Sequence, residues 1–160
     1  MRVKGIVDED FVNYKLPSMF ISTCYCDWKC CIEANIPISI CQNCELSDSE
    51  TYDISIESLY QRYINNNISE CIVLGGLEPA KQQSEINELI RYFRNNNCND
   101  TFVIYTGHYE DEIQEWIEYL KRYSNIVFKF GRYIPNNEPH YDEVLGIKLV
   151  SDNQYGKQIS

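Results

Sequence analysis

Cysteine is concentrated in one short segment of this chain, and its density there indicates chemistry rather than packing. Six of the eight Cys residues fall between positions 24 and 44, and residues 22–31 read STCYCDWKCC. Cysteine at this density forms a disulfide framework, a metal site or a redox site. The other two thiols, Cys71 at the start of an apolar run and Cys98 after a polar one, are expected to be an ordinary buried residue and a loop residue.

The spacing of the thiols narrows the choice of site. The charged N-terminal segment lacks the apolar stretch of a signal peptide, so we expect a cytoplasmic protein, in which metal binding or catalysis is favoured over disulfides. Cys26 and Cys30 have C-x3-C spacing, unlike the C-x2-C of most structural zinc knuckles. Cys41 and Cys44 do have C-x2-C spacing, but no second pair matches them. Because three thiolates hold an iron–sulfur cluster with one iron open, whereas four close a zinc site, the pattern favours iron–sulfur and leaves zinc as an alternative.

Composition and charge restrict the rest of the molecule. At 160 residues, 44% of them hydrophobic, the chain is predicted to form a single domain over residues 1–160, with the cluster loop at 24–44. The net charge of −10, without a basic cluster, makes nucleic acid an unfavourable partner. No apolar run approaches the roughly 20 residues of a membrane span, so we expect no membrane association.

Short apolar runs alternate with amphipathic segments, which predicts an α/β fold with a parallel sheet. Strands are expected at 17–23, 71–74, 101–106, 125–130 and 143–150, and helices at 54–66, 79–96 and 109–123. The carboxyl ends of parallel strands share one edge, where such folds bind ligands. The cysteine loop follows the first strand, and four glycines follow the next three, where they let backbone approach a ligand. These are Gly75, Gly76, Gly107 and Gly131.

Two of these motifs resemble those of the radical S-adenosylmethionine enzymes. Cys26 and Cys30 match the first two positions of that family's C-x3-C-x2-C loop, and the third position is occupied by Glu33. Cys41, followed by Gln-Asn, takes the third place after an insertion of eight residues. The sequence GGLEP at 75–79 resembles the glycine-rich segment with which the family contacts the amino group of S-adenosylmethionine.

The closest resemblance is to anaerobic ribonucleotide reductase activating proteins with an expanded cysteine loop, and it covers nearly the whole chain. It rests on NYKLPSMFIS, YCDWKC, ICQN, VLGGLEP, YTGHYEDEI, KFGRYIP and SDNQYGK. The resemblance implies a short, open, partial (βα) barrel of the radical S-adenosylmethionine type. It also implies an enzyme that cleaves S-adenosylmethionine to a 5′-deoxyadenosyl radical and generates a glycyl radical on the large subunit of anaerobic ribonucleotide reductase. Reduced flavodoxin or ferredoxin would donate the electron.

The resemblance also implies the residues of the site. Cys26, Cys30 and Cys41 would hold one [4Fe-4S] cluster, and no catalytic side chain is expected beyond it. S-adenosylmethionine would be bound by a second group of residues at the strand ends and near the C-terminus, namely Gly75, Gly76, Glu78, Thr106 and Asn153.

Three further cysteines, Cys24, Cys31 and Cys44, depart from the family pattern. Cys44 is an alternative third ligand, but Cys41 is preferred because Asn43 then stands in its usual place. Cys31 is a poor partner for the adjacent Cys30, since neighbouring side chains rarely reach two corners of one cluster. Two other functions remain open: a radical enzyme acting on a small molecule, and a non-enzymatic iron–sulfur or zinc module that does not bind S-adenosylmethionine.

Overall fold

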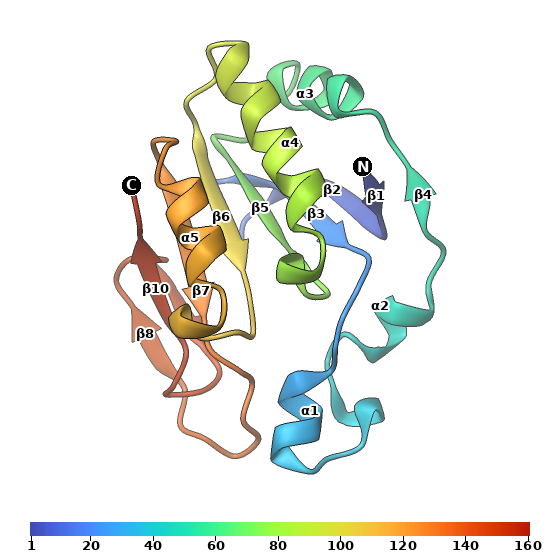
Figure 1. Ribbon diagram of the computed structural model, residues 1–160, viewed down its shortest axis with the longest axis vertical. Helices are drawn as coiled ribbons and strands as arrows, with labels where there is room; N and C mark the ends of the chain where they lie inside the picture. The colour runs from blue at the N-terminus through green and yellow to red at the C-terminus, as the bar shows by residue number, and fades with distance from the viewer.

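The computed structural model describes all 160 residues and shows an α/β architecture around a mixed six-stranded sheet (Figure 1). Its strand order is β10-β7-β6-β5-β3-β2. The four central strands are parallel, as expected: β3 (Ser18–Thr23), β5 (Cys71–Gly76), β6 (Thr101–Tyr105) and β7 (Ile126–Phe130). The two edge strands, β2 (Gly5–Asp10) and β10 (Tyr155–Gln158), run antiparallel to β3 and β7.

The expectation of a wholly parallel sheet therefore needs correction at both edges. The predicted strand at 143–150 does not join the sheet, because β9 (Ile147–Leu149) pairs only with β8 (His140–Asp142) in a separate two-stranded ribbon. A second small ribbon joins β1 (Arg2–Val3) to β4 (Tyr52–Asp53). The edge strands GIVDED and YGKQ escaped prediction because a half-exposed edge strand lacks the continuous apolar run of a central parallel strand.

The three expected helices are present and lie together over one face of the sheet (Figure 1). They are α3 (Ile56–Ile64), α4 (Gln83–Asn95) and α5 (Gln114–Leu120). The Ser55 hydroxyl caps α3 by accepting a hydrogen bond from the Ser58 N–H at 3.0 Å. The second and third predicted helices begin as separate 3-10 turns, η2 (Pro79–Lys81) and η3 (Glu110–Glu112), which makes the α-helices shorter than expected. None of the helices has the length and apolar character needed to cross a bilayer.

Alternation along the central strands separates two layers of side chains. Residues such as Leu74, Ile104 and Phe128 point toward the helices and form the main core. Their neighbours Val73, Val103 and Val127 point to the opposite face, where a smaller apolar cluster contains no helical residue. Tyr14, Leu145 and Leu149 pack on this face, so loops and the β8–β9 ribbon cover it in place of helices.

The cysteine loop contains short helical elements rather than irregular chain. These are α1 (Lys29–Ala34), η1 (Ile38–Ile40) and α2 (Cys44–Asp48). In Figure 1 they extend below the carboxyl ends of the central strands, away from α3 and α4. The loop thus lies where the sequence predicts a ligand site.

Candidate functional site

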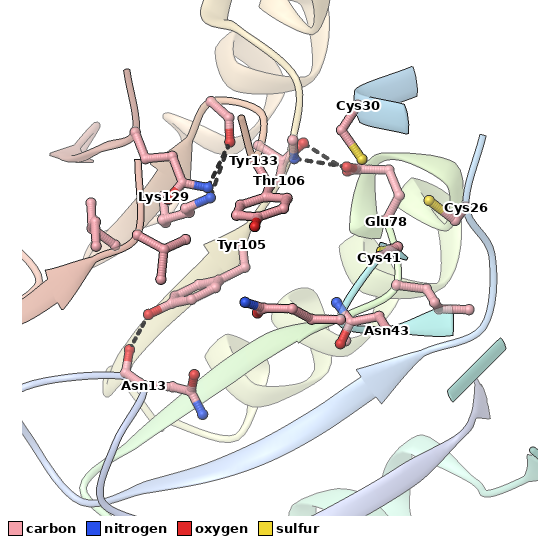
Figure 2. A pocket seen from close by; sticks show the side chains of 18 of the residues that line it. Asn13, Cys26, Cys30, Cys41, Asn43, Glu78, Tyr105, Thr106, Lys129 and Tyr133 are labelled. Atoms are coloured by element: carbon pink, nitrogen blue, oxygen red, sulfur yellow. Dashed lines mark hydrogen bonds between the residues drawn. The ribbon is translucent and has the colours of Figure 1, made fainter. Parts of the chain in front are cut away.

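A cavity of about 510 Å³ lies at the carboxyl ends of β3, β5, β6 and β7. One wall is formed by the cysteine loop, and another by residues of the helix-free face of the sheet, among them Tyr105 and Lys129 (Figure 2). Phe20 also belongs to this second wall. The hydroxyl of Tyr105 donates a hydrogen bond to the backbone carbonyl of Asn13, which fixes the phenol ring across the cavity. The site expected from the strand ends and the thiols is therefore a single hollow.

Three thiols line this cavity, and they are those of Cys26, Cys30 and Cys41 (Figure 2). Asn43, whose position favoured Cys41 over Cys44, lines it too. The three extra cysteines lie outside the lining: Cys24 and Cys31 are buried, and Cys44 begins α2. The Cys31 Sγ atom nevertheless approaches the Cys30 Sγ atom to 4.0 Å.

Local backbone geometry directs Cys26 into the cavity. Its Sγ atom accepts a hydrogen bond from the Trp28 N–H at 3.3 Å. Trp28 itself has a left-handed φ of 55°, an unfavourable conformation for a bulky side chain and one that clusters at functional sites. Burial raises the pKa of the Cys26 thiol to about 12 and also raises that of Cys30. Both thiols therefore stay protonated at neutral pH until a metal replaces the proton.

The metal-binding donors in the cavity lining are thiols. No group of three or more His, Cys, Asp or Glu side chains is arranged to hold a single metal ion, so the three thiols are not gathered around one point. The cavity lining contains three thiols and no fourth Cys. This number suits a four-iron cluster in which each thiolate binds one iron and the fourth iron has no Cys ligand.

Glu78 is the acidic centre of the cavity and is 7% exposed. Its Oε1 atom accepts hydrogen bonds from the Thr106 hydroxyl at 2.7 Å and from the Ala80 N–H at 2.9 Å. Its Oε2 atom accepts one from the Gly107 N–H at 2.8 Å. These bonds join the ends of β5 and β6 and leave Oε2 with capacity for one further donor, such as an ammonium group.

Gly76 lines the cavity with a φ of +81°, and a Cβ atom there would lie 2.9 Å from Leu46 and 3.1 Å from Ser22. Only glycine suits this backbone and this space. Gly75 is not part of the lining. It lies under the cavity wall, where a Cβ atom would meet the Phe20 ring at 3.0 Å.

Of the two remaining predicted contacts, Thr106 lines the cavity, and Asn153 lies outside the lining. The Asn153 amide instead donates hydrogen bonds to the Tyr109 hydroxyl at 3.1 Å and to the Arg132 carbonyl at 2.9 Å. Its neighbour Gln154 reaches the cavity, where its amide donates to the Gly131 carbonyl at 3.4 Å.

Lys129 lines the cavity but was not predicted as a site residue from the sequence. Its buried Nζ atom donates a hydrogen bond to the Gly131 carbonyl at 3.0 Å, and no carboxylate forms an ion pair with it (Figure 2). Burial lowers the pKa of Lys129 to about 8. A lysine inside the otherwise apolar strand IVFKF was the available signal, because lysine is rarely buried without a reason.

Comparison with known proteins adds one finding. Residues 16–149 match a family model described as a 4Fe-4S single cluster domain. No curated protein and no solved structure matches the chain. The matched range includes the three cavity thiols, Glu78 and Lys129.

Proposed function

Because this chain belongs to the family of 4Fe-4S single cluster domains and is an iron–sulfur protein, we propose that it is a radical S-adenosylmethionine enzyme that generates a glycyl radical on anaerobic ribonucleotide reductase. One observation carries the proposal. Three thiols and the hydrogen-bonded carboxylate of Glu78 face the same cavity, so a cluster ligand set and an ammonium acceptor lie within reach of one small molecule.

Cys26, Cys30 and Cys41 would hold the cluster in this cavity. A cluster held by these residues would supply the one-electron reduction, with reduced flavodoxin or ferredoxin as the electron source, for cleavage of S-adenosylmethionine to methionine and a 5′-deoxyadenosyl radical. The protein's own contribution is to bind, orient and shield the reactants.

The polar groups of the cavity match the charged ends of an amino acid. Glu78, with the backbone at Gly76, would bind the amino group of S-adenosylmethionine through the free capacity of Oε2. Lys129, a buried cation without a carboxylate partner, would bind its carboxylate. The rings of Phe20 and Tyr105 line the same cavity and present apolar surface that would displace water from the reacting atoms.

The layering of the fold supports an open partial barrel and a protein substrate. All three long helices cover one face of the sheet, and the cavity occupies the other. A glycine-bearing loop of the reductase would approach the cavity from this helix-free side. Exposed apolar side chains at its margin, Val12 and Val150, offer contacts for such a loop.

The proposal is tested by anaerobic reconstitution with iron and sulfide, followed by reduction with dithionite and addition of S-adenosylmethionine. We expect equimolar methionine and 5′-deoxyadenosine, and a glycyl-radical signal in electron paramagnetic resonance spectra only when the reductase is present. Cleavage without that signal would indicate a small-molecule substrate. A cluster that does not cleave S-adenosylmethionine would indicate an electron carrier, and tight zinc without a cluster would indicate a structural module.

The proposed role of Lys129 predicts a pH-dependent affinity. The groups facing its ammonium are Glu78 and Cys30, and burial outweighs both in lowering its pKa to about 8. Lys129 is therefore charged at pH 7 and increasingly neutral above pH 8. Affinity for S-adenosylmethionine should fall about tenfold between pH 7 and pH 9 in titrations of the reconstituted protein, because a charge-assisted hydrogen bond is lost.

Two variants check this assignment. Lys129→Met should bind weakly at both pH values and lose most of the pH dependence. Lys148→Met, which changes an exposed lysine in the cavity lining, should keep it. Equal pH dependence in wild type and Lys129→Met would show that another group is responsible.

A further inference from the structure

A buried arginine connects the cysteine loop to the strand ends. Arg132 follows β7 and is 4% exposed. Its Nη1 and Nη2 atoms donate to the two carboxylate oxygens of Glu112 at 2.8 Å and 2.6 Å. On its other side, Nη2 donates to Glu33 Oε1 at 2.9 Å, and Nε lies 2.6 Å from Glu33 Oε2. The guanidinium also stacks over the Tyr109 ring, 4.7 Å from its centre.

Glu33 belongs to α1, the helix that carries Cys30, and the two residues are three positions apart on it. Glu33 also occupies the position at which the uninterrupted C-x3-C-x2-C spacing would place a third Cys. Compared with the motif that the sequence resembles, this chain thus has a carboxylate at the position of the third ligand. In the structure that carboxylate is bound to Arg132 instead of facing the cavity.

The other charged residues of this stretch make contacts to the same region. Lys29 forms an ion pair with Glu112. Asp27, next to Cys26, lies 3.3 Å from His108 Nε2 and 3.7 Å from Lys81 Nζ. All three charged side chains between positions 27 and 33 thus reach segments that follow β5, β6 or β7.

Helix α1 needs such support because it has little of its own. It is six residues long, far below the length at which an isolated helix is stable. Trp28, the N-cap residue that precedes it, makes no side-chain cap, and Cys31 is the only buried residue of the helix. The buried guanidinium of Arg132 supplies α1 with a charge-assisted contact through Glu33.

We propose that Arg132 is a positioning residue that, with Glu112 and Glu33, clamps α1 to the sheet edge so that the Cys30 thiol faces the cavity before the cluster binds. A third Cys at position 33 would anchor α1 once it bound the cluster. In this chain the contact between Glu33 and Arg132 anchors the helix instead. The role of this clamp rests on the proposed function, because it presumes that Cys30 is a cluster ligand. The contacts themselves are present without a cluster, so the clamp is tested in the cluster-free protein.

The experiment measures alkylation of each thiol by iodoacetamide in the cluster-free, reduced protein, by mass spectrometry over time. Glu33→Gln and Arg132→Gln should each alkylate Cys30 about fivefold faster than wild type, the factor expected for losing a partly buried ion pair. The double variant should be no faster than Arg132→Gln alone, because both changes break the same contact. Alkylation of Cys98, which lies far from α1 in the sequence and follows α4, should not change.

Glu45→Gln is the matched control, since Glu45 lies in the same loop and forms no ion pair. It should leave Cys30 reactivity at the wild-type rate. An unchanged Cys30 rate in Glu33→Gln, whose side chain is half exposed and whose fold is not at risk, would overturn the clamp. A rise of the same size in Glu45→Gln would also overturn it, by showing general loosening of the loop.

A second readout uses the reconstituted protein. Iron loss to a chelator should be about fivefold faster in Glu33→Gln than in wild type or Glu45→Gln, because Cys30 is less firmly held. The two proposals fail separately. Failure of the wild type to cleave S-adenosylmethionine would refute the proposed function and leave the alkylation result standing, whereas unchanged Cys30 alkylation would refute the clamp whatever the enzyme's activity.

Discussion

Replacing Cys41 by Ala should abolish cluster binding, whereas replacing Cys44 by Ala should leave it intact. The Cys41 thiol lines the cavity beside Cys26 and Cys30, and the Cys44 thiol does not. With only two thiols left in the lining, a four-iron cluster loses one of its three protein ligands. We expect S-adenosylmethionine cleavage to fall by more than about 100-fold, since even outer-shell partners of a metal site contribute 10–100-fold.

The measurement is iron and acid-labile sulfide per chain after anaerobic reconstitution, with the electron paramagnetic resonance spectrum of the reduced protein. Cys26→Ala and Cys30→Ala should behave like Cys41→Ala. Cys98→Ala, a cysteine outside the loop, is the control for loss of a thiol as such. If Cys44→Ala lost the cluster and Cys41→Ala retained it, the loop would have to rearrange on binding and the ligand set would be wrong.

Replacing Glu78 by Gln should weaken the binding of S-adenosylmethionine by about 10- to 100-fold while the cluster still assembles. The carboxylate accepts three hydrogen bonds from Thr106, Ala80 and Gly107 and keeps one acceptor position free. An amide in its place turns one oxygen into a donor, which faces another donor in a buried site. The variant thus loses both the ammonium contact and part of the link between β5 and β6, each a charge-assisted hydrogen bond of about 1.5–3 kcal/mol.

This prediction has a stability component that is measured separately. The free energy of unfolding of Glu78→Gln should fall by about 1–3 kcal/mol, because a buried donor is left without a partner. Glu70→Gln, at an exposed position just before β5, should alter neither affinity nor stability. Wild-type affinity in Glu78→Gln would remove Glu78 from the binding site and, with it, the observation on which the proposed function depends.

The sequence was informative wherever a property is local. Apolar runs predicted β3, β5, β6 and β7. A central parallel strand is buried on both faces, so nearly all of its residues are apolar. Glycines after these strands, together with the cysteine loop, predicted the edge at which the cavity lies. The edge strands β2 and β10 were missed, because their pairing with β3 and β7, rather than their own composition, makes them strands.

Properties that depend on distant residues were not predictable in this way. The contact of Arg132 with Glu33 spans 99 positions and joins two residues that read as ordinary surface charges. Asn153 was predicted to contact the ligand, whereas its neighbour Gln154 lines the cavity, because the backbone conformation decides which of two adjacent amides turns inward. The shortening of the two later helices arises because each begins with a 3-10 turn whose sequence reads as helical.

The position of Glu33 has a consequence for the entropic cost of closing the cysteine loop. Between two ligands of one metal centre, extra residues normally add slack and a larger entropic cost of closing the loop. Here the chain is fastened at Glu33 by its contact with Arg132, so only residues 34–40 lie between that contact and Cys41. With the proposed ligand set, the contact between Glu33 and Arg132 therefore lowers the entropic cost of the long spacing between Cys30 and Cys41.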